Sequence, residues 1–165
     1  MTAIETNEDI NIVAIWLRKD PVRWLSGALA GVFAGLAALA VAGILSGDIW
    51  FLARMAAVPC AGAQAFNFDA PGSTLVMGLV NQLGLCVFLG VLYAHFTGTN
   101  HVGALFGIGL TWGLFSWIFI NNLFLPSFRE IYALGINSAA ALVVCLAFGL
   151  SLMSVRIFEG MIRRN

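Results

Sequence analysis

The stretch from Ala70 to Phe128, APGSTLVMGLVNQLGLCVFLGVLYAHFTGTNHVGALFGIGLTWGLFSWIFINNLFLPSF, decides the fold of this protein. Its 59 consecutive residues contain no Asp, Glu, Lys or Arg. A helix needs about 20 apolar residues to cross the hydrocarbon core of a bilayer, so the stretch is long enough for two crossings. A soluble protein would not expose so long an apolar, uncharged stretch to water, and we therefore expect a membrane protein.

The composition of the whole chain agrees with this expectation. The 165 residues are 61% hydrophobic and only 10% charged, whereas soluble domains are about 25% charged. The formal net charge of zero argues against nucleic acid as a partner. The three cysteines have neither a CxxC nor another zinc-binding spacing.

Four apolar segments are each long enough to cross a bilayer, and they cover residues 24–46, 73–96, 102–125 and 137–158. Trp24, Trp50, Tyr93 and Tyr132 lie near their ends, where such rings favour the boundary between lipid and water. The sequence predicts an all-α integral membrane protein in which residues 21–165 form a single four-transmembrane-helix bundle.

Residues 1–20 are predicted to form a separate amphipathic helix that lies along the membrane surface. Apolar side chains share one of its faces, namely Ile10, Val13, Ala14 and Leu17. An ordered tail that packs on a neighbouring subunit is the alternative. Asp20 and Pro21 fit the N-cap and first position of the following span.

The basic residues predict the orientation of the bundle. Six of the eight flank the first and fourth spans on the side of the termini: Arg18, Lys19, Arg23, Arg156, Arg163 and Arg164. By the positive-inside rule, both termini are cytoplasmic. In the first outer connection, residues 48–58 are expected to form a short interfacial helix before Pro59, with Trp50, Phe51 and Met55 facing lipid.

Glycines recur at four-residue spacing in two spans, as Gly27, Gly31 and Gly35 and as Gly109 and Gly113. Such GxxxG stripes let helix backbones approach closely, and the partner helix can belong to this chain or to another. A faint repeat pairs residues 27–31 with residues 103–107, GALAG with GALFG. Two copies of a helical hairpin would explain it.

Neutral polar side chains provide two further candidate sites. Asn81, Gln82, Asn121 and Asn122 fall in the outer half of the predicted bundle. Because an unsatisfied amide in hydrocarbon costs several kcal/mol, they either line a polar pocket for a small ligand or quinone head group, or join helices by hydrogen bonds. His95 and His101, on either side of the cytoplasmic turn, are candidate axial ligands of haem or a pigment, or interfacial residues at helix ends.

Charged residues are missing from the central part of every predicted span, although proton relays and most ion-coupled transporters depend on them. The sequence also lacks GxSxG, HExxH and P-loop motifs. We therefore expect a protein that is not an enzyme and holds no cofactor, and that acts as an accessory or scaffold subunit of a larger membrane complex or as a homo-oligomer. The alternatives are a small channel or carrier lined by the amides, and a subunit that binds haem or a pigment.

Three segments resemble small four-span bacterial inner-membrane proteins of the YagU type: Gly27–Gly35, Gly90-Val91-Leu92-Tyr93 and Phe148-Gly149-Leu150. The resemblance covers about half of the chain. It implies a bacterial inner-membrane location and the same all-α architecture, but no established chemistry. The acidic, proline-rich first loop of that group is not reproduced here.

Overall fold

The computed structural model of the chain describes residues 20–67, 72–99, 101–128 and 137–164, and these residues form helices and no strands. Within them, four helices are long and apolar enough to cross a membrane: Pro21–Ser46, Gly72–Phe96, Val102–Phe124 and Ser138–Ile162. The prediction of an all-α, four-span membrane fold is thereby confirmed. The amphipathic helix predicted before Asp20 lies outside the described residues.

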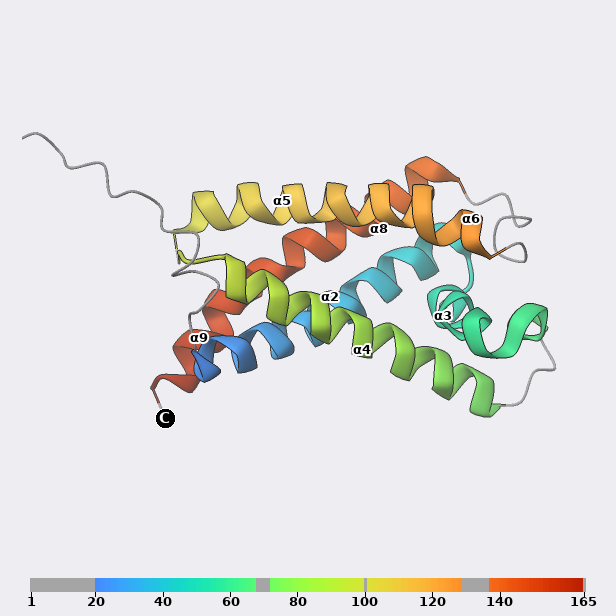
Figure 1. Ribbon diagram of the computed structural model, residues 1–165, viewed down its shortest axis with the longest axis horizontal. Coiled ribbons are helices and arrows are strands. Elements are labelled where there is room, and N and C mark those ends of the chain that lie inside the picture. The colour runs from blue at the N-terminus through green and yellow to red at the C-terminus, as the bar shows by residue number, and fades with distance from the viewer. Residues whose placement is uncertain (1–19, 68–71, 100, 129–136, 165) are drawn as a thin grey trace, which may run out of the picture.

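Figure 1 shows the helices in chain order. The first span is α2 (Pro21–Ser46) and the second is α4 (Gly72–Phe96). The third consists of α5 (Val102–Phe119) and a π-helical turn, η2 (Ile120–Phe124), and is followed by α6 (Leu125–Ser127). The fourth consists of α8 (Ser138–Ser151), a 3₁₀ turn η3 (Leu152–Ser154) and α9 (Val155–Ile162). Between the first two spans lie α3 (Phe51–Ala61) and the 3₁₀ helix η1 (Gly62–Phe66).

The helix α2 occupies the centre of this arrangement, since it packs against α4 on one side and against α8 and α9 on the other. The helix α5 packs mainly against α8. Accordingly, 39% of the residues in the 18-residue apolar stretch of α2 are buried, against 17% in the corresponding stretches of the second and third spans. The spans α4 and α5 therefore form the outer members of the bundle and expose most of their surface to lipid.

Both ends of α2 follow from its sequence. The side chain of Asp20 accepts a hydrogen bond from the backbone N–H of Arg23, and Pro21 begins the helix, as predicted. At the other end Gly47 adopts a left-handed φ of 73° and donates its N–H to the carbonyl of Gly43. Glycine is favoured there because the left-handed conformation costs it nothing.

Apart from Arg23 and Leu39, the buried face of α2 consists of small residues, and most of its large apolar residues point outward. Its buried apolar positions include Ala30, Ala34, Ala38 and Ala42, whereas large side chains are exposed: Leu25, Leu29, Phe33, Leu36 and Ile44. Water would favour the opposite pattern. In lipid, a large apolar side chain gains little by leaving its surroundings, and close backbone packing holds the helices together instead.

Glycines bring α2 and α4 into direct backbone contact. A Cβ added at Gly31 would lie 2.3 Å from the carbonyl oxygen of Cys86, and one at Gly27 would lie 2.6 Å from that of Gly90. A Cβ at Gly35 would meet the Cys86 side chain at 3.1 Å. The stripe in the first span is thus covered by a helix of the same chain.

The pair formed by α5 and α8 repeats this contact. A Cβ at Gly109 would lie 2.7 Å from the carbonyl oxygen of Gly149, and one at Gly113 would lie 2.7 Å from that of Cys145. The partner helix in both pairs carries the same pattern, CVFLG at residues 86–90 and CLAFG at residues 145–149. The two helical hairpins therefore use one mode of packing twice.

The register of this repeat differs from the one that the sequence indicates. In the structure the counterpart of Gly27 is Gly109, six residues beyond the start of the GALFG match. A Cβ at Gly107 would meet nothing within 4 Å, and one at Gly103 would meet only the ring of His101. The GALFG match at residues 103–107 therefore results from the glycine-rich composition of the spans. The glycines that helix packing requires in α5 are the ones that face α8.

The helix α3, between the first two spans, also differs from its prediction. It continues through Pro59 to Ala61, and Met55 is buried rather than facing lipid. The reason is the approach of α4, where a Cβ at Gly78 would lie 1.9 Å from the carbonyl oxygen of Ala53. Met55 then joins a small core with Val58 and with residues of α4 and η2.

Two substitutions in one helix test the glycine contact. Gly90→Ala places a methyl group against the backbone of α2, and we expect it to destabilise the protein by about 1–3 kcal/mol, as overpacking does. Gly84→Ala, where nothing lies within 4 Å, is the matched control and should unfold like the wild type. Unfolding in detergent, followed by circular dichroism, measures both. Equal stability of the two variants would contradict the packing described here.

Candidate functional site

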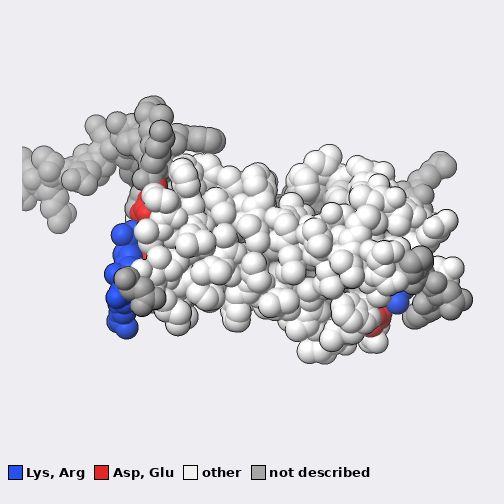
Figure 2. All heavy atoms as spheres, turned by 90° about the horizontal axis from the view of Figure 1, so that it is seen from below, with Lys and Arg blue, Asp and Glu red and all other residues white. Residues whose placement is uncertain are grey.

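Figure 2 shows charged side chains gathered at one end of the molecule and a smaller group at the other. The end where α2 begins and the fourth span ends carries Arg23, Arg156, Arg163 and Arg164 and is called the basic end below. Arg23 is only 3% exposed there. It lies four residues before Gly27, on the stripe of α2 that packs against α4. The position of the side chain in a helix contact explains its burial.

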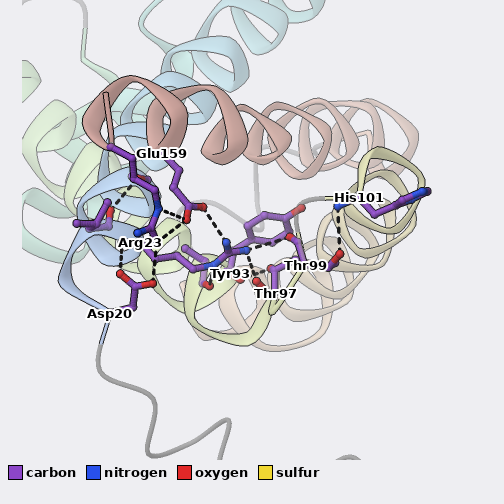
Figure 3. A network of polar contacts seen from close by, with 11 residues as sticks. Asp20, Arg23, Tyr93, Thr97, Thr99, His101 and Glu159 are labelled. Atoms are coloured by element: carbon purple, nitrogen blue, oxygen red, sulfur yellow. Dashed lines mark hydrogen bonds and ion pairs between the residues drawn. The ribbon is translucent and has the colours of Figure 1, made fainter. Parts of the chain in front are cut away.

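The guanidinium of Arg23 binds the end of α4. Its Nε donates to the carbonyl oxygen of Ala94 at 2.9 Å, and its Nη2 donates to those of Thr97 and, at 3.1 Å, Thr99 (Figure 3). The last carbonyls of a helix have no partner within the helix and carry partial negative charge. Arg23 supplies both hydrogen bonds and a positive charge to them.

The same guanidinium also binds α9. Its Nη1 donates to Oε2 of Glu159 at 2.8 Å, and Glu159 is 4% exposed. The other carboxylate oxygen of Glu159 accepts from Arg163, which in turn lies 3.1 Å from Oδ2 of Asp20. Four charged groups thus connect the start of α2 with the end of the fourth span (Figure 3).

The electrostatics of this group favour the ionised state of Arg163. The hydrogen bond and the ion pair with Glu159 raise the pKa of Arg163, and the nearby Asp20 acts in the same direction. A carboxylate between two guanidinium groups has its charge balanced and its lone pairs occupied. The network suits the joining of helices rather than proton transfer.

A second buried arginine lies near the other end of the molecule. Arg54 of α3 is 8% exposed, with its Nε 3.2 Å from Oδ2 of Asp48 and its Nη1 donating to the carbonyl of Asn67. It connects α3 with the residues before and after it. Like Arg23, it is a charge that stabilises the chain's own backbone.

The four amides of the proposed pocket make their hydrogen bonds in different places. Asn81 donates across to the carbonyl oxygen of Ala56 in α3 at 3.1 Å. Gln82 donates to the sulfur of Cys86, one turn along its own helix. The hydrogen bonds of these two residues therefore lead to α3 and along α4, and not to the amides of the third span.

The amides of the third span lie in the π-helical turn η2. Asn121 and Asn122 donate to the carbonyls four residues before them, those of Trp117 and Ile118. These side chains use acceptors that a regular α-helix would give to backbone N–H groups, which accounts for the wider turn. The hydroxyl of Ser138 contacts Oδ1 of Asn121 at 3.4 Å and so joins η2 to the start of α8.

The two histidines lie in different surroundings. Nδ1 of His95 accepts a hydrogen bond from the indole N–H of Trp24 at 3.2 Å. His101 is exposed before α5, and Figure 3 shows its ring pointing away from Arg23. Among the described residues, no three His, Cys, Asp or Glu side chains come together as a metal site.

The Arg23 network is the feature that sequence reasoning missed. The signal was present, because Arg23 continues the four-residue spacing of Gly27, Gly31 and Gly35 toward the start of the helix. The sequence alone indicates only that Arg23 contributes to the orientation of the bundle. Its ion pair spans 136 positions of sequence, and no local pattern identifies Glu159 as the partner.

A substitution of Glu159 tests the network. Glu159→Gln leaves Arg23 buried without its carboxylate, and we expect a loss of stability of about 3–5 kcal/mol, the usual cost of removing one partner of a buried pair. Arg164→Gln changes an exposed side chain at the same end and should change stability by less than about 0.5 kcal/mol. Unfolding by a denaturing detergent, with both variants beside the wild type, gives the comparison. A wild-type transition for Glu159→Gln would refute the role of the pair.

Comparisons of the chain with protein-family models, with curated proteins and with solved structures give no match.

Proposed function

We propose that this protein is a non-catalytic accessory or scaffold subunit, which packs in the membrane against other subunits or against copies of itself. The observation that carries the proposal is that its polar side chains are used to hold its own helices together. Arg23 and Glu159 join three helices, and Asn81 joins α4 to α3. Among the described residues, what remains for contact with other molecules is mainly apolar surface.

The outer members of the bundle supply this surface. Large apolar side chains on α4 and α5 are 44–64% exposed, among them Val80, Phe88, Leu114, Phe115 and Ile118. Because the glycine stripes are covered inside the chain, a partner would pack against these larger side chains. This proposal therefore differs from the one based on sequence, in which a glycine stripe was a candidate contact with the partner.

The amides and histidines give less support to the two alternatives. A channel or carrier would need the four amides to face one pathway, whereas their hydrogen bonds lead to α3, to α8 and along their own helices. Axial ligation by a neutral His95 through Nε2 would place the ring proton on Nδ1 and so break the hydrogen bond that Nδ1 accepts from Trp24. We therefore propose a protein without a cofactor.

A photo-crosslinking amino acid at three exposed positions tests the proposed packing. We place it at Phe115 of α5, Phe88 of α4 and Leu36 of α2, which are 60%, 58% and 52% exposed. In native membranes we expect a specific protein adduct from α4 or α5 and none from α2. Three positions that react only with lipid, together with a monomer on native gels, would contradict the proposal.

We also propose a bacterial inner-membrane location with both termini in the cytoplasm, which the arginines of the basic end support. The native cysteines give a direct test, because Cys60 on α3 is exposed while Cys86 and Cys145 are buried. A membrane-impermeant thiol reagent should label Cys60 in intact spheroplasts, and Cys60→Ser should abolish the signal.

The control for this orientation is a cysteine at the basic end. Arg164→Cys in the Cys60→Ser background should be labelled only after the membrane is permeabilised. The opposite pattern, with Arg164→Cys labelled in intact spheroplasts and Cys60 protected, would reverse the orientation.

A further inference from the structure

A groove of about 320 Å³ opens where α2, α5 and the fourth span meet at the basic end. Its lining is almost entirely apolar and includes Phe33, Val102, Leu105, Leu150 and Ile157. Three of these side chains, Phe33, Val102 and Ile157, are at least half exposed. The groove therefore opens on the lipid-facing surface and not toward the interior of the bundle.

The groove extends from the basic end toward the middle of the membrane. Val102 is the first residue of α5, whereas Phe33 lies ten residues beyond Arg23 along α2. At 1.5 Å per residue, ten residues of helix cover about 15 Å. The groove thus runs from the level of the charged groups into the hydrocarbon layer, along the direction in which acyl chains lie.

Arg156 lines the polar end of this groove. It is exposed, and within the described part of the chain it makes no hydrogen bond or ion pair, unlike Arg23, Arg54 and Arg163. Glu159, one turn away, is already bound to two other arginines. An arginine near the end of a span extends its guanidinium to the lipid head groups, where a phosphate can accept two parallel hydrogen bonds from it.

We propose that this groove binds one anionic glycerophospholipid, with its phosphate on Arg156 and one acyl chain along Phe33, Leu105 and Leu150. The size favours a lipid over a helix, because a helix with its side chains is about 10–12 Å across, whereas a flexible acyl chain fits a narrow groove. The charge favours an anionic lipid, since the groove contains an arginine and no carboxylate of the described residues. The inference does not depend on the proposed role as a subunit.

Native mass spectrometry tests the charge part of the proposal. The protein is incubated in detergent with equal amounts of phosphatidylglycerol and phosphatidylcholine of the same acyl chains. We expect phosphatidylglycerol to be retained preferentially, and Arg156→Gln to lower its retention about fivefold, the contribution of one basic residue near a charged membrane surface. Arg164→Gln removes the same charge outside the groove and should retain the lipid. Equal retention of the two lipids by the wild type, or equal losses in the two variants, would overturn the proposal.

A pair of uncharged variants tests the groove itself. Val102→Trp fills the groove at an exposed position, and Val76→Trp adds the same side chain on α4 away from it; the two valines are 50% and 60% exposed. We expect Val102→Trp to lose phosphatidylglycerol and Val76→Trp to retain it, both with wild-type circular dichroism. Undiminished binding by Val102→Trp would overturn the proposal. A photo-crosslinker at Val102 that captures a protein rather than lipid in native membranes would do so as well.

Discussion

The close approach of α2 and α4 is the contact on which the rest of the structure depends. In a bilayer the helices gain little from hiding apolar side chains, so their association requires close van der Waals contact between backbones. Gly27, Gly31 and Gly90 make this contact possible, since a Cβ at any of them would lie within 2.6 Å of a backbone oxygen. With α4 held in this way, α2 can also pack against α8 and α9 and become the central helix.

The charged network is a consequence of the same contact. Arg23 lies on the stripe that α4 covers, so its guanidinium comes within reach of the Ala94 carbonyl in the last turn of α4 and of the Thr99 carbonyl just beyond this helix. A charge buried in this way requires a partner, because an uncompensated buried ion is costly, and Glu159 of α9 provides it. The ion pair therefore joins the fourth span to a helix pair that is already packed, and it does so at the end where the chain can reach water.

This use of polar groups limits what the protein can do. Its buried arginines, Glu159 and its amides bind the chain's own backbone and side chains. Within the described part of the chain this leaves an apolar surface and two exposed arginines without a partner, Arg156 and Arg164, of which Arg156 lines the groove. Apolar faces suit packing against other membrane helices, and an arginine beside a narrow apolar groove suits an anionic lipid. Both proposals describe binding in the membrane and neither requires catalysis.

The sequence by itself determined the solvent, the four spans and the cap at the start of the first, because the length of an apolar segment and a cap such as Asp20 are local properties; the fourth span continues four residues beyond its predicted end, to Ile162. It also identified Gly27 and Gly109 as contact positions, but not their partners, since any apolar helix could cover them. Only the tertiary structure decided that α4 and α8 do so, that Met55 is buried under α4, and that Arg23 meets Glu159. These outcomes depend on which helix faces pack together across long separations in the chain. Because the helices are hydrophobic on nearly all of their faces, the sequence of one helix does not show which face will contact which partner.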